Sequence, residues 1–385
     1  MWRRAPPAAN LPPSDELVLR LRVQAQRLSA ATGRSATPPV VLREICGLQA
    51  QLMSAAGLGL RVRSAGLNAG TVRHALNQDR SIVRTWLMRG TLHLVAADDL
   101  GWLLSLLGPI FASGSEARHA QLGLDRDLKL RGVDTIRRTL KDTGPLTRYE
   151  LVDQLQRRGI RLDPKSQAPI HLIRFAALQG VLCLGPDREN REPTYVLIDD
   201  WIGQPSSPSG EPSLGELARR YFAAYGPATA EDLASWSGLP LSQARSAVAL
   251  AMPALAELTI RGQSGFLLKG RLPRSRPPAP ANPAVRLLPA FDTYLLGYRN
   301  RELTIPRPPL RRRLQRGGGW LHPAVIVNGR AVGAWRLAGA GPRQELRIEP
   351  FEKLSRAVQA GIEAEARDIS RFLDFPLETK IAEPA

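Results

Sequence analysis

Two glutamines separated by a single residue, Gln49 and Gln51, have types and spacing that would let them act on one target. An amide orients a water molecule, but it does not take up a proton usefully at neutral pH. On a regular helix, residues i and i+2 lie about 200° apart and cannot share a target. The helix expected at 38–53 must therefore end or distort around them if both act, and the SAAG run at 54–57 is consistent with an ending. Otherwise, such a pair is ordinary polar surface.

Two further titratable residues lie inside apolar runs. His93, in RGTLHLV, alternates with apolar neighbours on an expected strand, which is typical of a core residue or of one that lines a site. Asp292, in PAFDTYLLGY, is an acid in a strongly apolar run. Because buried acids need partners, Asp292 is expected either to anchor an arginine or to line the same site.

The charge of the chain favours a polyanion as its partner. Among 385 residues, 53 lysines and arginines face 35 acids, which gives a formal net charge of +18. Binding to a polyanion then releases counterions, and nucleic acid is preferred over a membrane surface. One basic cluster is either a solvated face or a phosphate contact: Arg311, Arg312 and Arg313.

The pair Asn328-Gly329 is a strong signal for a two-residue hairpin turn, and Arg330 follows it. Two interpretations are open for this tip. It is a plain turn, or it enters a DNA groove with Arg330 leading and Asn328 beside it.

Several classes of protein are not indicated. Cys46 and Cys183 lie in apolar runs, which is typical of buried free thiols. No histidine or cysteine spacing indicates a metal site, and no apolar run reaches the ~18 residues of a membrane span. The N-terminal stretch has no apolar core of a secretory signal. We therefore expect a bacterial-type cytoplasmic protein without metal, organic cofactor or membrane contact.

Two stretches rich in Pro, Ser and Gly, 203–213 and 272–283, are interpreted as linkers. Before the second one, a pattern occurs twice, as GPLTRYEL at 144–151 and GPATAEDL at 226–233. Gly-Pro ends the preceding helix, and Thr followed three residues later by an acid predicts a capping box at the next one. In both copies a helix and two strand-like runs follow, which is the order of a winged helix-turn-helix unit.

The sequence thus predicts an α+β fold with three tandem winged helix-turn-helix units. They are expected at 12–105, 130–202 and 214–271. In the first, a wing is formed by VRTWLM and TLHLVA, and the helices are expected at 15–29, 38–53 and 71–78.

The last part, 284–376, is predicted to be a β-rich, barrel-like domain with a terminal helix. Its strands are expected in VRLLPAFDTYLLGY, LHPAVIVNGRAVGAWRL and ELRIEP, and its amphipathic helix at 351–373.

Four runs occur in a fixed order along the chain: LREICGLQAQLMSAAGLGLRVR, TWLMRGTLHLVAADDL, LPAFDTYLLGYRNR and GGWLHPAVIVNGRAVGAWR. Together they resemble the winged-helix DNA glycosylase family of bacteria, which excises alkylated bases and includes enzymes that unhook interstrand crosslinks. The resemblance covers about residues 12–370.

The family's motif is Gln, an apolar residue, then Gln or Asp, and it is matched by Gln49-Ala50-Gln51. The resemblance implies that Gln49 and Gln51 position the attacking water and hold the nucleotide. It also implies a monofunctional DNA repair glycosylase whose partner is duplex DNA with alkylated purines. Without a carboxylate, such an enzyme needs an easy leaving group, and a cationic N7- or N3-alkylpurine leaves as a neutral base. The motif contains no lysine, so it gives no support to a Schiff-base lyase step.

Two alternatives share the charge and the repeats. One is a non-catalytic winged-helix DNA-binding protein, such as a transcription regulator. The other is a structural adaptor that uses winged helices for protein contacts, and it should lack DNA binding with strong salt dependence.

Overall fold

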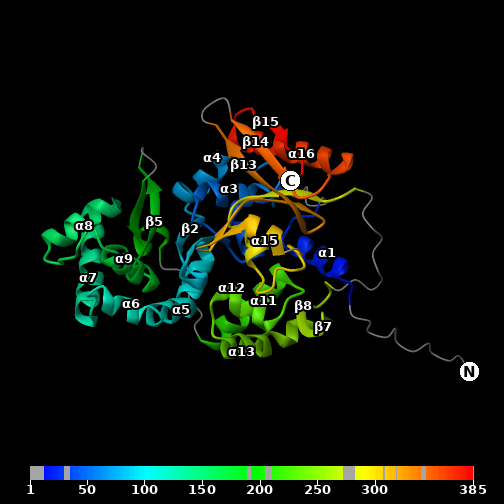
Figure 1. Cartoon of the computed structure of the whole chain (residues 1–385). Helices are drawn as coiled ribbons and strands as arrows, with labels where there is room; N and C mark the ends of the chain where they lie inside the picture. The colour runs from blue at the N-terminus through cyan, green and yellow to red at the C-terminus, as the bar shows by residue number, and fades with distance from the viewer. Residues whose placement is uncertain are drawn as a thin grey trace, which may run out of the picture.

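The computed structural model describes residues 13–29, 35–188, 192–203, 210–271, 282–306, 308–317, 319–339 and 344–384. The chain has a mixed α+β fold. Figure 1 shows the segment 97–202 on the left, the segment 211–268 below, and the segment 285–381 in yellow to red at the upper right. The blue N-terminal elements lie between these groups.

The first segment of the chain holds both glutamines, and its second helix is shorter than predicted. Helix α2 ends at Ile45, because Cys46 and Gly47 take left-handed conformations with φ of 58° and 88°. The SAAG run at 54–57 lies inside the next helix, so its interpretation as a helix ending was wrong. The elements are α1 (Asp15–Ala25), α2 (Pro38–Ile45), β1 (Leu48–Gln49), α3 (Met53–Arg61), α4 (Ala69–Asn77), β2 (Ile82–Trp86), the 3-10 turn η1 (Met88–Gly90) and β3 (Leu92–Ala96).

A six-stranded sheet joins this segment to the next one, in the order β1-β3-β2-β5-β6-β4. The hairpins expected as two separate wings meet in it, since β2 and β5 pair antiparallel at Arg84 and Leu184. The elements are α5 (Ala97–Ser113), α6 (Glu116–Gln121), α7 (Arg126–Thr143), β4 (Leu146–Thr147), α8 (Arg148–Arg157), α9 (Ala168–Leu178), β5 (Leu182–Asp187), β6 (Pro193–Leu197) and α10 (Ile198–Ile202).

Three helices and a separate two-stranded sheet form the third group. Both predicted capping boxes are confirmed, one at Thr147 with Glu150 and the other at Thr229 with Asp232. Residues 204–209 and 272–281 of the expected linkers lie outside the described residues. The elements are α11 (Glu211–Tyr225), α12 (Ala230–Ser237), α13 (Leu241–Ala251), η2 (Met252–Ala254), β7 (Leu255–Ile260) and β8 (Gln263–Leu268).

The C-terminal strands form an open sheet in the order β15-β14-β13-β12-β9, with an edge at each end, and not the barrel that we expected. The run after β9 is also not a strand, because Asp292 caps a short helix there. The elements are β9 (Val285–Leu288), α14 (Thr293–Leu296), α15 (Pro308–Leu314), β10 (Gln315–Arg316), β11 (Trp320–Leu321), β12 (Ala324–Val327), β13 (Arg330–Ala338), β14 (Glu345–Pro350), α16 (Arg356–Leu373) and β15 (Glu378–Ile381).

The C-terminal sheet shares a hydrophobic core with the first segment of the chain. Val41 and Leu94 belong to the same buried cluster as Trp335 and Ile362 of the sheet and its helix. The segment that carries the glutamines therefore begins as the edge strand β1 of the six-stranded sheet, beside the core that this sheet shares with the C-terminal one. Cys46 and Cys183 are buried free thiols, as predicted, and burial raises the pKa of each to about 12.

Within the described residues, the helices include none with the length and apolar character needed to cross a membrane. The same part of the chain holds no cluster of His, Cys, Asp and Glu that suits a metal ion.

Candidate active site

The two glutamines lie on an extended segment, which removes the geometric conflict of a helix. Gln49 is the last residue of β1 and pairs across the sheet with His93. The backbone N–H of Ala50 continues the pairing by donating to the carbonyl of Leu92 at 2.7 Å. Since side chains alternate along an extended chain, residues i and i+2 share a side. The burial pattern agrees with such an alternation: Ala50 is buried, whereas Gln49 is partly exposed and Gln51, in the bend after β1, is exposed.

Arg84, on the neighbouring strand β2, fixes the backbone of this segment. Its Nε donates to the carbonyl of Ala50 at 2.9 Å, and its Nη2 donates to the carbonyl of Gln51 at 3.2 Å. Burial lowers the pKa of Arg84, and the charge of Asp187 opposes that effect. The pKa of the Asp187 carboxyl is itself raised by burial and lowered by Arg84. The Asp187 carboxyl thus acts electrostatically on Arg84, which holds the backbone of the motif.

The side chain of Gln49 is held by Arg89, in the turn between β2 and β3. Nη2 of Arg89 donates to Oε1 of Gln49 at 2.6 Å, and Nη1 donates to the carbonyl of Trp236 on α12. A guanidinium has donors only, so the Gln49 oxygen must face it and the amide NH2 group must face the other way. Burial lowers the pKa of Arg89 to about 10, which leaves the side chain charged at neutral pH.

Gln51 is held less firmly than Gln49. Its side chain is exposed, and its Oε1 accepts only a long bond of 3.4 Å from the backbone N–H of Leu92. A bond of this length is weak, so a water molecule can replace it at little cost. The motif therefore combines one fixed amide, on Gln49, with one adaptable amide, on Gln51.

His93 lies beside Gln49 and is neutral. The side chain is 2% exposed, and burial lowers its pKa to about 3, with the charge of Arg89 acting in the same direction. Nδ1 lies 2.9 Å from the carbonyl of Thr91, which cannot donate, so Nδ1 carries the proton. Such burial fits a core residue as well as one that lines a site, and in either role His93 cannot serve as an acid at neutral pH.

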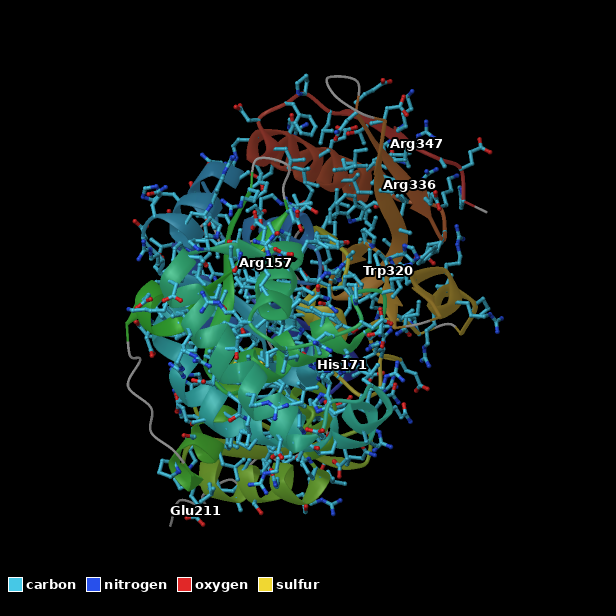
Figure 2. All side chains as sticks on the ribbon, turned by 90° about the vertical axis from the view of Figure 1, so that its left-hand side faces the viewer. Arg157, His171, Glu211, Trp320, Arg336 and Arg347 are labelled. Atoms are coloured by element: carbon cyan, nitrogen blue, oxygen red, sulfur yellow. The ribbon has the colours of Figure 1, made fainter. Side chains whose placement is uncertain are left out.

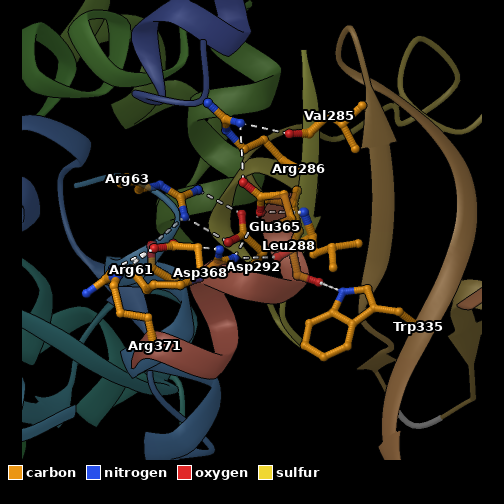
Figure 3. Close-up of polar contacts among 12 residues, drawn as sticks. Arg61, Arg63, Val285, Arg286, Leu288, Asp292, Trp335, Glu365, Asp368 and Arg371 are labelled. Atoms are coloured by element: carbon orange, nitrogen blue, oxygen red, sulfur yellow. Dashed lines mark hydrogen bonds and ion pairs between the residues drawn. The ribbon is translucent and has the colours of Figure 1, made fainter. Parts of the chain in front are cut away.

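Asp292 lies apart in a buried ionic network, where it anchors an arginine. Its two carboxylate oxygens each accept a bond from Arg63 at 2.8 Å, and Oδ1 also accepts from the backbone N–H of Tyr294 at 2.9 Å. Figure 3 shows this pair beside Arg61, which contacts Glu365 and Asp368 of α16. Of the two roles that the sequence left open, the structure shows the structural one.

The arginines of α15 enter three different environments. Arg311 lines a polar pocket, and Arg312 is exposed. Arg313 lies over the ring of Phe351, with its Cζ 4.8 Å from the ring centre. The triplet is therefore not one solvated face.

The predicted two-residue turn at Asn328-Gly329 is confirmed, since Val327 pairs with Arg330. The tip is docked, however, and does not project. Oδ1 of Asn328 accepts from the N–H of Ala284 at 2.9 Å, and the carbonyl of Gly329 accepts from the hydroxyl of Tyr294 at 2.9 Å. This packing favours a plain turn over a tip that enters a DNA groove, although Arg330 itself stays partly exposed.

Sequence reasoning missed Arg84 and Arg89, which hold the motif. A signal for Arg89 was present in the RG pair before the strand, since Gly90 follows Arg89 in a left-handed conformation with φ of 63°. A Cβ at Gly90 would also overlap the guanidinium of Arg174. The pair therefore marks a crowded, non-standard turn and not a simple hairpin connection.

The model of the family described as "DNA glycosylase AlkZ-like" matches residues 42–372, which is most of the chain. The chain belongs to this family of DNA glycosylases. A relative from Streptomyces sahachiroi, an "interstrand DNA cross-link repair glycosylase", is 30% identical over 367 residues, covering 92% of this chain and 95% of the relative. The match confirms the resemblance seen in the four sequence runs and favours an enzyme over a regulator or an adaptor.

A solved structure agrees with this membership of the AlkZ-like family. The S. sahachiroi DNA glycosylase AlkZ superposes with a TM-score of 0.82 at 28% identity, covering 97% of this chain and all of the other one. The agreement extends over nearly the whole chain, so the mixed α+β fold is shared with that glycosylase.

Proposed function

We propose that this AlkZ-like glycosylase hydrolyses the N-glycosidic bond of cationic N7- or N3-alkylpurines in duplex DNA, with Gln49 and Gln51 as its catalytic residues. The observation that supports this most is that Gln49 and Gln51 are both accessible on either side of buried Ala50, while neutral His93 pairs with Gln49 across the sheet. No carboxylate of the described residues is hydrogen-bonded to either amide. A base that is already cationic leaves as a neutral molecule and requires no protonation.

The different restraint on the two glutamines suggests different roles. Arg89 occupies the oxygen of Gln49, so Gln49 offers its NH2 group as a donor to an oxygen of the nucleotide. Gln51 is exposed and weakly held, so its oxygen is the better acceptor for the attacking water. The proton of that water then passes to solvent, because an amide does not retain it. An abasic site remains as the product.

We further propose that the protein recognises DNA through three tandem winged helix-turn-helix units and a C-terminal β-rich domain. The proposed boundaries are 12–105, 130–202, 214–271 and 284–376. Supporting observations are the two capping boxes and the strand pairs β2–β3, β5–β6 and β7–β8, each of which follows helices. Arg312 and Arg330 are candidates for phosphate contact on this surface, and a net charge of +18 makes the binding steeply salt-dependent.

Interstrand crosslinks that join alkylated purines fall within the same chemistry. Each half of such a crosslink is a cationic alkylpurine, and the S. sahachiroi relative is described as a cross-link repair glycosylase. We infer that this protein unhooks such crosslinks as well as removing simple adducts.

Single-turnover excision of N7-methylguanine from duplex DNA tests the assignment. Gln49→Ala and Gln51→Ala should each slow excision by about 10²-fold, as expected for the loss of one preorganised hydrogen-bonding group. Affinity for DNA should stay unchanged, because both side chains are neutral. Excision at the wild-type rate by both variants would remove them from the mechanism.

Asp187→Asn is the matched control, since it removes a carboxyl whose charge acts on Arg84, the arginine that holds the backbone of the motif. This variant should excise at nearly the wild-type rate. A loss as large as that of Gln51→Ala would assign the general base to Asp187 and would overturn the carboxylate-free mechanism. Uracil and 8-oxoguanine should not be released by any variant, because these neutral bases leave poorly without an acid.

A further inference from the structure

A polar pocket of about 510 Å³ lies between the third group of elements and the C-terminal part of the chain. Three arginines line it: Arg299, Arg301 and Arg311. Three acids also line it: Glu231, Asp232 and Glu302. The question is which of these charges are balanced within the protein.

The three acids are already engaged. Glu231 accepts from Arg245 at 3.0 Å, and Asp232 accepts from the backbone N–H of Arg299 at 2.8 Å while it caps α12. Glu302 lies 3.6 Å from a guanidinium nitrogen of Arg261. Each acid thus has a partner other than the side chains of the three pocket arginines.

Arg301 and Arg311, in contrast, have no such partner. Among the described residues, neither guanidinium forms an ion pair or a hydrogen bond, and the Nε atom of each is buried without a partner. Burial lowers the pKa of Arg301, and the charge of Arg311 lowers it further. Two like charges therefore line one partly desolvated pocket, which is unfavourable unless an anion binds there.

The pocket lies close to the candidate active site. The first turn of α12 lines the pocket, and the carbonyl of Trp236, near the end of the same eight-residue helix, accepts from Arg89. Eight helical residues span about 12 Å, which is about twice the separation of neighbouring phosphates along a strand. Arg301 is also close enough for its charge to lower the pKa of Arg89. Arg89 in turn holds Gln49.

We propose that this pocket binds one phosphodiester of the DNA strand whose nucleotide lies at Gln49 and Gln51, with Arg301 and Arg311 as its ligands. The position of the strand rests on the proposed function. A guanidinium fork matches phosphate geometry, and a DNA strand carries a phosphate on each side of the target nucleotide.

A bound phosphate would also reduce the repulsion between positive charges near the active site. The proposed substrate base is cationic, and Arg89 and Arg301 place further positive charge near it. A phosphate bound between Arg301 and Arg311 neutralises that charge when DNA is present. Free protein and complex then differ in local charge, so binding and catalysis are coupled through one anion.

Binding to a duplex with an uncleavable abasic analogue tests the pocket without any chemistry. Arg301→Gln and Arg311→Gln should each lower affinity by about tenfold and reduce the slope of log affinity against log salt by about 1. Arg347→Gln is the control, because Arg347 points outward from the C-terminal sheet (Figure 2) and Glu345 keeps Lys380 as a partner. The control should change affinity by less than twofold.

Methylphosphonate substitution, one phosphate at a time, locates the contact in the wild-type protein, whose folding is not in question. One position near the analogue should reproduce the tenfold loss, and the same substitution should cost Arg301→Gln little more. Arginine variants that bind like Arg347→Gln, or losses that add at every position, would overturn the proposal. Neither result depends on excision, so a failure of the glutamine assignment is distinguishable.

Inorganic phosphate separates a phosphodiester site from a site for free phosphate. At equal ionic strength, phosphate should compete with DNA no more strongly than chloride does. Much stronger competition that disappears in Arg301→Gln would assign the pocket to free phosphate and overturn the DNA contact.

Discussion

Two buried regions of the molecule use arginine in opposite ways. In the core between α3, α14 and α16, Arg63 has Asp292 and Arg61 has Glu365, with nitrogen–oxygen distances of 2.8 and 3.1 Å (Figure 3). Around the glutamines, Arg89 and Arg301 are partly buried, but no carboxylate pairs with either among the described residues. The charge in the first region is balanced by carboxylates of the chain, whereas that of Arg89 meets only the neutral oxygens of Gln49 and Trp236 among the described residues.

The difference follows from the cost of burying a charge. A buried guanidinium is tolerated when a carboxylate offsets its lost hydration, and such a pair then fixes one arrangement of the surrounding elements. A guanidinium without that partner raises the free energy of the unbound protein. It is retained where a bound anion, or the orientation of a second side chain, makes use of it.

The largest expected effect on stability comes from a substitution in the region where arginines and carboxylates are paired. Asp292→Asn leaves the buried charge of Arg63 without its carboxylate, and loss of one partner from a buried pair typically costs about 3–5 kcal/mol. Denaturant unfolding should show this loss in the free energy of unfolding. Arg347→Gln, an exposed change that also removes one charge, of opposite sign, should cost less than about 1 kcal/mol. A small effect of Asp292→Asn would mean that the pair does not hold these elements together.

The balanced region was partly foreseeable from the sequence. An acid in an apolar run requires a partner, and Asp292 was expected to anchor an arginine or line the site. Which arginine it meets depends on a contact between residues far apart in the chain, with 229 positions between Arg63 and Asp292. Local patterns do not encode such a contact, and for the same reason they did not show that two hairpins merge in one sheet through Arg84 and Leu184.

The site was foreseeable as residue types but not as geometry. The motif Gln49-Ala50-Gln51 was found by its resemblance to a family, and the conflict of i and i+2 on a helix was recognised. The conflict does not arise in the structure because α2 ends just before Cys46, a residue that takes a left-handed conformation although it is not a glycine. The glycine that follows, Gly47, is left-handed as well and was a compositional signal for this ending that the sequence analysis did not use. Arg89 was missed because its partners, Gln49 and Trp236, lie 40 and 147 positions away.

Arg89, which has no carboxylate partner among the described residues, is expected to act on the reaction by orienting Gln49. Arg89→Met keeps the length of the side chain but removes the donor that fixes the oxygen of Gln49. Excision of N7-methylguanine should slow by about tenfold, less than the ~10²-fold expected when a catalytic group itself is lost. Arg89→Lys should recover part of the rate, because it restores a donor. Single-turnover kinetics and DNA affinity should be measured side by side.

A double-variant cycle shows whether Arg89 acts through Gln49. In the Gln49→Ala background, Arg89→Met should have little further effect on the excision rate, since the contact that it removes is already absent. Losses that multiply would instead show that Arg89 acts on the DNA directly. Thermal unfolding of each single variant and of the double variant checks that no loss of rate reflects a damaged fold.

The smallest effect concerns His93, which is kept neutral partly by the uncompensated charge of Arg89. Its pKa is about 3 in the folded protein against 6.5 for an unperturbed histidine. Between these values the unfolded chain binds a proton that the folded chain does not, so stability is full above pH 6.5 and falls as the pH falls toward 3. From pH 7 to 5.5, this one group should lower the free energy of unfolding by about 1 kcal/mol.

The excision rate of the folded protein should not follow this change, since His93 stays neutral throughout. His93→Gln should remove that part of the pH dependence when unfolding is measured against denaturant at several pH values. The opposite result would be an excision rate that changes with a pKa near 6.5 in the wild-type protein and does not change with pH in His93→Gln. It would show that His93 binds a proton in the folded protein and takes part in the reaction.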